Sequence, residues 1–286
     1  MEGEGVFRSW DELIPDALGV IFSNLSHAEK LAVVPRVCKS WGKVVMGPCC
    51  WQEIDMEEWS TRSDPDNVDR MLRMLIRRSG GSLRKLCVSA LHSDFIFSFI
   101  ADHAGSLQTL RLPRSNMTDT MVEQKAASLS AITFIDLSYC EKIGARSLEA
   151  IGKHCKSLTG LRRNMHPINR DSGKLSQEDE ARAIAVTMPK LKWLEIAYLL
   201  VDTGSVLEII CGCPELELLD LRGCWDVRLD EKYLHEKVPK LKVLGPLVLD
   251  QFERNGVWEF CSDYSDDSFY ETDRSDGMWD DGAEVL

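Results

Sequence analysis

The chain has 286 residues, of which 44% are apolar, and a formal net charge of −12. This length allows one or two domains with a sizeable core. No stretch approaches the roughly 20 uninterrupted apolar residues that a membrane span needs, and the acidic first ten residues are unlike a signal peptide. We therefore expect a folded, soluble protein of the nucleus or cytoplasm, with no membrane partner.

The negative charge is concentrated at the carboxyl terminus. Residues 259–286 contain ten acidic side chains and one basic side chain, Arg274, so this segment carries −9 and the remainder only −3. A body without a basic stripe has no electrostatic footprint for DNA or RNA, so we expect no nucleic-acid partner. Residues 251–286 are predicted to form a disordered acidic tail, whose interleaved aromatic residues permit a short binding motif.

The ten cysteines are expected to be thiols, because the chain lacks a secretion signal and their spacing forms no disulfide framework. Neither Cys49-Cys50 nor Cys211-Gly-Cys213 has the two-residue spacer of common zinc knuckles, and no paired histidine motif accompanies them. We expect no metal and no other cofactor. The sequence also shows no pairing of nucleophile and base and no phosphate-cradling glycine loop, so no catalytic residue is predicted.

The first fifty residues predict three short helices. Pro15 and Asp16 suit the first turn of one helix, and Ser26 with Glu29 forms a reciprocal cap at the start of the next. Pro35 cannot donate to the helical ladder, so it ends this second helix or opens a new one. Apolar residues recur at helical spacing throughout. Helices this short bury too little surface alone, so part of their apolar face should be covered by a partner or by the next domain.

These residues resemble the F-box, whose pattern runs Leu-Pro, Ile-Phe-Ser-x-Leu, Val-Cys-Lys-x-Trp and a late Trp. The matching strings are residues 14–18, 21–25 and 37–41, followed by Trp51; Ile14 stands where Leu is usual, and Pro35 interrupts the middle segment. The resemblance implies that residues 10–55 bind a Skp1-type adaptor, which connects to a cullin and a RING subunit. A helical cap for the following segment is the alternative. The adaptor-binding residues that the resemblance implies are Ile14, Pro15, Leu18, Ile21, Phe22, Leu25, Val34, Val37, Cys38, Trp41 and Trp51.

Units of the form Leu-x-x-Leu-x-Leu recur from residue 83 onward. Their starts step by 24, 25, 26, 33, 25 and 25 residues, and all but the step of 33 match the period of leucine-rich repeats. Helix-like apolar segments lie between them, so each unit is predicted to be a strand, a turn and a helix. Stacked units share a continuous core. Residues 56–250 therefore predict an α/β solenoid of about seven repeats, with parallel strands on the concave face and helices on the convex face. The units begin at Leu83, Leu107, Ile132, Leu158, Leu191, Leu216 and Leu241.

Two repeats continue as Asp-Leu-Ser-Tyr-Cys (residues 136–140) and Asp-Leu-Arg-Gly-Cys (residues 220–224). They resemble the cysteine-containing class of repeat, with the thiols as small packing residues. The resemblance spans residues 10–250 and is closest to plant F-box proteins with leucine-rich repeats. It implies a non-catalytic, substrate-recognition subunit of a Skp1–cullin–F-box ubiquitin ligase, which promotes ubiquitination and proteasomal degradation of a bound protein through proximity. The alternative is a scaffold that binds the adaptor without delivering a target.

Side chains alternate along each short strand, so the residues between the leucines are expected on the open concave surface. Two of them, Phe134 and Trp193, are large aromatics that we predict to contact the target; the alternative is that either ring packs on the sheet. An insertion near residues 164–177 explains the step of 33 and is a second candidate for target contact. The predicted target-binding residues are Lys85, Arg111, Phe134, Asp136, Arg162, Trp193, Glu195, Asp220 and Arg222.

Overall fold

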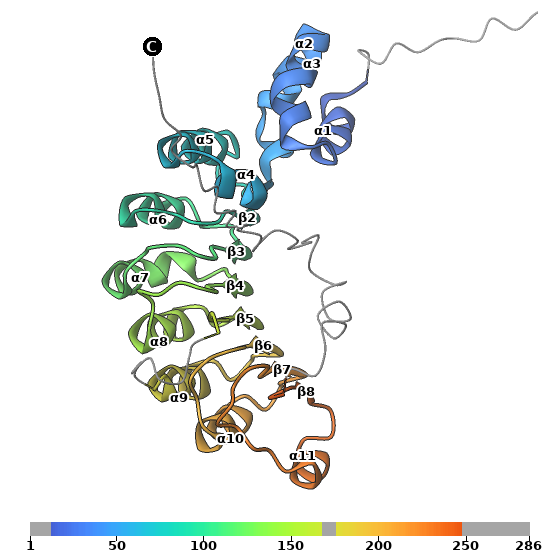
Figure 1. Cartoon of the computed structure of the whole chain (residues 1–286). Helices are drawn as coiled ribbons and strands as arrows, with labels where there is room; N and C mark the ends of the chain where they lie inside the picture. The colour runs from blue at the N-terminus through green and yellow to red at the C-terminus, as the bar shows by residue number, and fades with distance from the viewer. Residues whose placement is uncertain (1–12, 168–175, 248–286) are drawn as a thin grey trace, which may run out of the picture. The chain divides into compact units, whose positions relative to one another are not determined.

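A computed structural model of the chain describes residues 13–167 and 176–247 (Figure 1). In this part of the chain, eight parallel strands form one sheet in which the strand order follows the chain order. The predicted α/β solenoid with parallel strands is confirmed. The strands are β1 (Glu53–Asp55), β2 (Lys85–Cys87), β3 (Thr109–Arg111), β4 (Phe134–Asp136), β5 (Gly160–Arg162), β6 (Trp193–Glu195), β7 (Leu218–Asp220) and β8 (Lys242–Leu244).

Helices stack along one side of these strands, and at least one helix separates each strand from the next (Figure 1). The central residue of each of the first seven strands points into the layer between strands and helices and is at most 1% exposed. The core is therefore collective, as expected for repeats that cannot bury their own apolar faces. The helices are α4 (Glu57–Arg62), α5 (Pro65–Arg78), α6 (Asp94–Asp102), α7 (Asp119–Lys125) with the short 3₁₀ turn η4 (Ala126–Leu129), α8 (Ala145–His154), α9 (Glu178–Thr187), α10 (Thr203–Gly212) and α11 (Glu231–Lys237).

Strand β1 precedes the seven repeats recognised in the sequence. Trp51, Ile54 and Met56 occupy the three positions that leucines hold in later units, and all three are buried. The segment predicted as the end of the amino-terminal unit thus also begins the sheet. The Trp51 indole donates a hydrogen bond of 2.7 Å to the carbonyl of Val45, and the Arg78 guanidinium of α5 lies 5.7 Å from the Trp51 ring centroid.

Short helices precede the sheet. The predicted reciprocal cap is confirmed, because the Ser26 amide donates to a Glu29 carboxylate oxygen at 2.9 Å and the Glu29 amide donates to the Ser26 hydroxyl at 3.2 Å. Pro35 lies in the first turn of a new helix, where its missing amide hydrogen is tolerated, and the turn before it is a wider π-helix. These elements are α1 (Pro15–Ser23), the π-helix η2 (Glu29–Val33), α2 (Val34–Val37), α3 (Lys39–Met46) and the 3₁₀ helix η3 (Pro48–Trp51).

The cysteines of the described residues are free thiols, as predicted, and several tie neighbouring repeats together. The Cys140 thiol donates to the Leu112 carbonyl at 3.2 Å, and the Cys224 thiol donates to the Ile196 carbonyl at 3.2 Å. Burial raises the pKa of both thiols to about 12. They therefore stay protonated and act as small packing residues with a donor. The same kind of contact to the preceding repeat is made by Cys155 and Cys213.

None of the helices in residues 13–167 and 176–247 is long and apolar enough to cross a membrane. The predictions for residues 1–9 and for the acidic tail 251–286 lie outside the described residues, as does the centre of the insertion, residues 168–175.

Candidate functional site

The amino-terminal helices expose an unusual number of large apolar side chains, which we call the amino-terminal apolar face. Each is between 44% and 67% exposed, although a folded chain usually buries such groups. A concentration of exposed apolar area within about 35 residues marks a protein interaction surface. The amino-terminal apolar face consists of Ile14, Val20, Ile21, Val33, Val37 and Met46.

Helix α1 is apolar on more than one side, and the structure shows which side faces inward. Leu18 and Phe22, four residues apart, are each 1% exposed, whereas Ile14 and Ile21, seven residues apart, project outward. The Phe22 ring packs against the Trp41 ring of α3 with centroids 5.1 Å apart. The helices therefore use one apolar stripe for their own core and leave the other uncovered.

This division corrects part of the predicted adaptor-binding set. Leu18, Phe22, Val34 and Trp51 are at most 3% exposed, so they hold the helices together and do not present a contact surface. Of the other predicted residues, Ile14, Pro15, Ile21 and Val37 are exposed, and Leu25, Cys38 and Trp41 are half-buried. Sequence reasoning missed the exposed residues Val20, Val33 and Met46; the four-residue step from Val33 to Val37 was the available signal.

The opposite face of the sheet from the helices, the strand face, carries two rows of side chains. They come from the first and the third residue of each strand, and the parallel register sets each row in line across the sheet. We call them the first row and the second row. From β2 to β8 the first row is Lys85, Thr109, Phe134, Gly160, Trp193, Leu218 and Lys242, and the second row is Cys87, Arg111, Asp136, Arg162, Glu195, Asp220 and Leu244.

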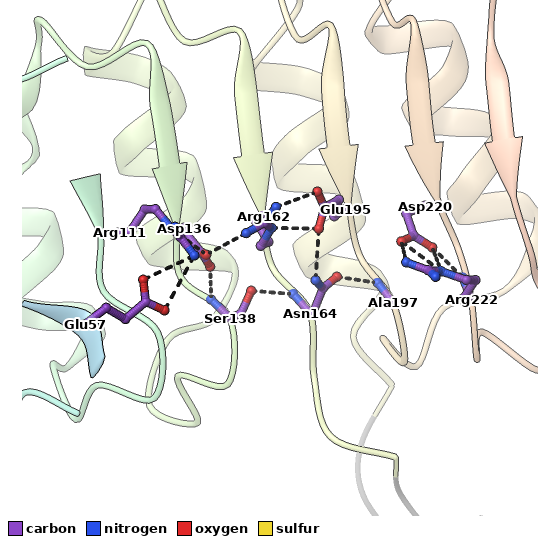
Figure 2. A network of polar contacts seen from close by, with 10 residues as sticks. All are labelled: Glu57, Arg111, Asp136, Ser138, Arg162, Asn164, Glu195, Ala197, Asp220 and Arg222. Carbon is purple, nitrogen blue, oxygen red and sulfur yellow. Dashed lines mark hydrogen bonds and ion pairs between the residues drawn. The ribbon is translucent and has the colours of Figure 1, made fainter. Parts of the chain in front are cut away.

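The charges of the second row neutralise one another (Figure 2). Arg162 donates two hydrogen bonds to Glu195, at 2.7 and 3.0 Å, and lies 3.3 Å from a carboxylate oxygen of Asp136. Arg111 lies 3.6 Å from Asp136 and 3.2 Å from Glu57 of α4. Opposite charges therefore alternate from Glu57 across β3, β4, β5 and β6. We call this set the charge ladder.

The charge ladder corrects the predicted target-binding set. Asp136, Arg162, Glu195 and Asp220 are at most 5% exposed, although alternation along the strands had placed them on an open surface. Their side chains do lie on the strand face, but ion pairing with neighbours turns them along the sheet. Asp220 accepts hydrogen bonds from Arg222, two residues further on, at 2.6 to 3.1 Å.

Burial dominates the electrostatics at the end of the ladder. Burial raises the pKa of Glu57, and the nearby Arg111 guanidinium opposes that rise. A hydrogen bond from Asp220 raises the pKa of Arg222. The remaining predicted strand-face residues, Lys85, Arg111, Phe134, Trp193 and Arg222, are half-buried.

The first row is apolar at its centre. Phe134 leans over the neighbouring strand, where a Cβ atom on Gly160 would lie 2.5 Å from the Phe134 Cδ2 atom. Beyond Gly160, Trp193 is aligned with Leu218, which is 8% exposed. Both aromatic rings thus pack partly on the sheet and remain partly open to solvent. The first row is the part of the strand face that offers apolar contact area.

The feet of the insertion are fixed by buried polar side chains that the sequence reasoning did not assign. Arg163 takes the place of the third leucine of its repeat and is 1% exposed. Its guanidinium pairs with Glu180 at 2.9 Å and donates to the carbonyls of Leu137, Cys140 and Ile143 at 3.3, 3.2 and 2.7 Å. Next to it, Asn164 donates to Glu195 at 3.2 Å, which links the insertion to the charge ladder.

One group of possible metal ligands occurs within the described residues. Oxygen and sulfur atoms of Asp55, Glu57 and Cys87 lie within 4.8 Å of one another. Glu57 is already paired with Arg111, and burial raises the pKa of Cys87 to about 12. A neutral thiol beside a guanidinium is a poor site for a cation, so this group does not fit a metal centre.

No family model matches this chain. The chain is 59% identical over 273 residues to F-box protein FBW2 of Arabidopsis thaliana, covering 94% of this chain and 86% of that protein. It is 33% identical to F-box protein SKIP1 of the same plant, covering 93% of this chain and 98% of SKIP1. It is 31% identical to the Arabidopsis putative F-box/LRR-repeat protein 21, covering 87% of this chain and 86% of that protein.

Proposed function

We propose that this chain, which belongs to the family of F-box proteins, is the target-recognition subunit of a Skp1–cullin–F-box ubiquitin ligase. The observation that carries the proposal is the amino-terminal apolar face, six large apolar side chains left open on a helical unit that already has its own core. Burial of this face by a Skp1-type adaptor would supply the stabilisation that such short helices lack.

The adaptor would connect the chain to a cullin and a RING subunit, and the repeats would hold the target. No catalytic step is assigned to this chain, because holding target lysines near a ubiquitin-loaded partner raises their effective concentration without chemistry of its own. The proposal includes a location in the nucleus or cytoplasm, in keeping with the free thiols of the described residues. It assigns no role to nucleic acid or to a membrane.

The adaptor surface is tested with one charge at a time. Val37→Glu places a carboxylate on the amino-terminal apolar face, and Val186→Glu makes the same change at a 75% exposed position on α9. Because an unpaired charge in an apolar interface is costly to desolvate, we expect Val37→Glu to weaken binding to a purified Skp1-type adaptor by at least about tenfold. Val186→Glu should bind as the unaltered chain does. Equal binding by the two variants would remove the adaptor assignment.

For the target, the proposed contact surface is the first row, centred on Phe134 and Trp193. Replacing either ring by Ala should weaken target capture by about 1 kcal/mol or more and leave adaptor binding unchanged. Phe95→Ala, at an 80% exposed position on α6, is the matched control. Targets are identified as proteins that co-purify with the chain and accumulate when it is absent. Recovery of the adaptor without a cullin would instead favour a scaffold that does not deliver its target for degradation.

A further inference from the structure

Positive charge is concentrated on α5 and the loop that follows it. Residues 70–85 contain six basic side chains and no acidic one, whereas the chain as a whole is strongly acidic. Helix α5 lies on the helical side of the sheet, away from the strand face (Figure 1). This charge therefore belongs neither to the charge ladder nor to the first row. The basic side chains are Arg70, Arg73, Arg77, Arg78, Arg84 and Lys85.

Two of these arginines share one aromatic ring of the next helix. The guanidinium carbon of Arg73 lies 4.6 Å from the ring centroid of Phe99 on α6, and that of Arg77 lies 5.6 Å from the same centroid. The His103 ring packs against Phe99 as well, with centroids 4.2 Å apart, and its Nδ1 atom is 2.8 Å from the Phe99 carbonyl oxygen. Phe99 thus gathers three nitrogen-rich side chains at one place on the surface.

The stacking fixes the guanidiniums but leaves their hydrogen-bond donors available. A cation–π contact uses the face of the guanidinium, while the five N–H groups lie in its plane. Within residues 13–167 and 176–247, no carboxylate forms an ion pair with Arg73 or Arg77 at 4.0 Å or less. Asp69 is the acidic group that senses Arg73 most directly; burial raises its pKa, and Arg73 opposes the rise. The in-plane donors of both guanidiniums are suited to bind oxygen anions.

We propose that the outer face of α5 and α6, centred on Arg73, Arg77 and Phe99, binds an acidic segment of a protein partner. Residues four apart on a helix have Cβ atoms roughly 6 Å apart, and alternate side chains of an extended peptide repeat at roughly 6.6 Å. The match selects an extended segment with carboxylates at alternate positions. Nucleic acid is disfavoured because the chain around this face carries net negative charge, which repels a polyanion of that length.

The experiment uses the full chain and a fluorescent peptide of six Glu-Ser repeats, with binding measured by anisotropy at low ionic strength. The control peptide has six Glu followed by six Ser, so composition is the same and the alternation is lost. The variants are Arg73→Gln, Arg77→Gln and the double change, and Gln preserves helix propensity. Arg182→Gln removes an equal charge from an exposed position on α9 and serves as the matched control. Phe99→Leu keeps both charges but removes the ring that holds them.

We expect the alternating peptide to bind about fivefold more weakly to each single variant and about twentyfold more weakly to the double variant, with Arg182→Gln unchanged. Phe99→Leu should bind between the unaltered chain and the double variant. Undiminished binding by the double variant, equal binding of the block peptide, or tighter binding of single-stranded RNA would each overturn the proposal. A peptide with phosphoserine in place of Glu that binds more than tenfold tighter would overturn the assignment to carboxylates. Adaptor binding, measured in parallel, keeps this test separate from that of the proposed function.

Discussion

Arg163 provides a stringent test of how the repeats are held together. The third leucine position of its repeat is filled by this guanidinium, which binds three carbonyls of the preceding turn and the Glu180 carboxylate of α9. Arg163→Leu restores the consensus residue of the repeat. On hydrophobic pattern alone the change should stabilise the protein, whereas the contacts predict the opposite.

The magnitude follows from what the substitution leaves behind. Removing one partner of a buried ion pair costs about 3–5 kcal/mol, because the other charge stays buried without compensation. Three carbonyls also lose a donor, while the new leucine returns about 2 kcal/mol of apolar burial. The net loss in unfolding free energy is therefore about 2–4 kcal/mol. For a chain of this size that corresponds to a fall in Tm of about 5–15 °C.

Urea and thermal unfolding of the full chain measure this loss. Arg182→Leu, at an exposed position on the same helix as Glu180, should change stability by less than about 0.5 kcal/mol. The double variant Arg163→Leu with Glu180→Leu removes the stranded carboxylate and should recover at least about 1 kcal/mol. If Arg163→Leu is as stable as Arg182→Leu, or if the second substitution recovers nothing, the buried pair does not anchor the repeat as argued.

Three further outcomes are expected. Gly212→Ala should cost about 1–3 kcal/mol in chemical denaturation, because its Cβ atom would lie 2.2 Å from the Ala185 carbonyl oxygen, whereas Gly204→Ala in the same helix meets only ordinary contacts and should gain up to about 1 kcal/mol. A gain at both glycines would contradict the close approach of α9 and α10. Iodoacetamide at pH 8 should label Cys49 and Cys211 in the folded chain, and mass spectrometry should find the buried thiols unmodified until the chain unfolds. Above the ordinary thiol pKa of 9.0, the unfolded chain loses protons that the folded chain keeps, so stability should fall with rising pH by up to about 1.4 kcal/mol per unit for each thiol of raised pKa; a flat urea midpoint from pH 8 to 10 would be inconsistent with Cys87, Cys140, Cys155, Cys213 and Cys224 being buried as described.

The repeat pattern predicted the sheet well because its physical cause is local. A leucine every 24 to 26 residues at the same point of a strand must be buried, and the strands from β2 to β8 all fall where the pattern places them. Strand β1 was missed because Trp51 and Met56 stand in place of leucines. The charge ladder was missed for a different reason. Its partners are 26 to 33 residues apart, although the alternating signs at Arg111, Asp136 and Arg162 were visible in the sequence.

The amino-terminal helices show a limit of pattern reasoning. Helix α1 has two apolar stripes, and periodicity alone does not say which one faces the core. Leu18 and Phe22 proved to be inside, while Ile14 and Ile21 lie outside. The choice depends on α3, whose Trp41 ring fits against Phe22. That contact joins segments about 20 residues apart, so it is a property of tertiary packing.

The alternation along the charge ladder limits how the number of repeats can change. Arg111, Asp136, Arg162 and Glu195 follow one another on adjacent strands, so removing the single unit that carries Asp136 would set two guanidiniums side by side. Removing two adjacent units would restore the order of signs. Gain or loss of repeats in this part of the array is therefore expected to be tolerated in pairs, and an odd number would require a compensating substitution at the third strand position.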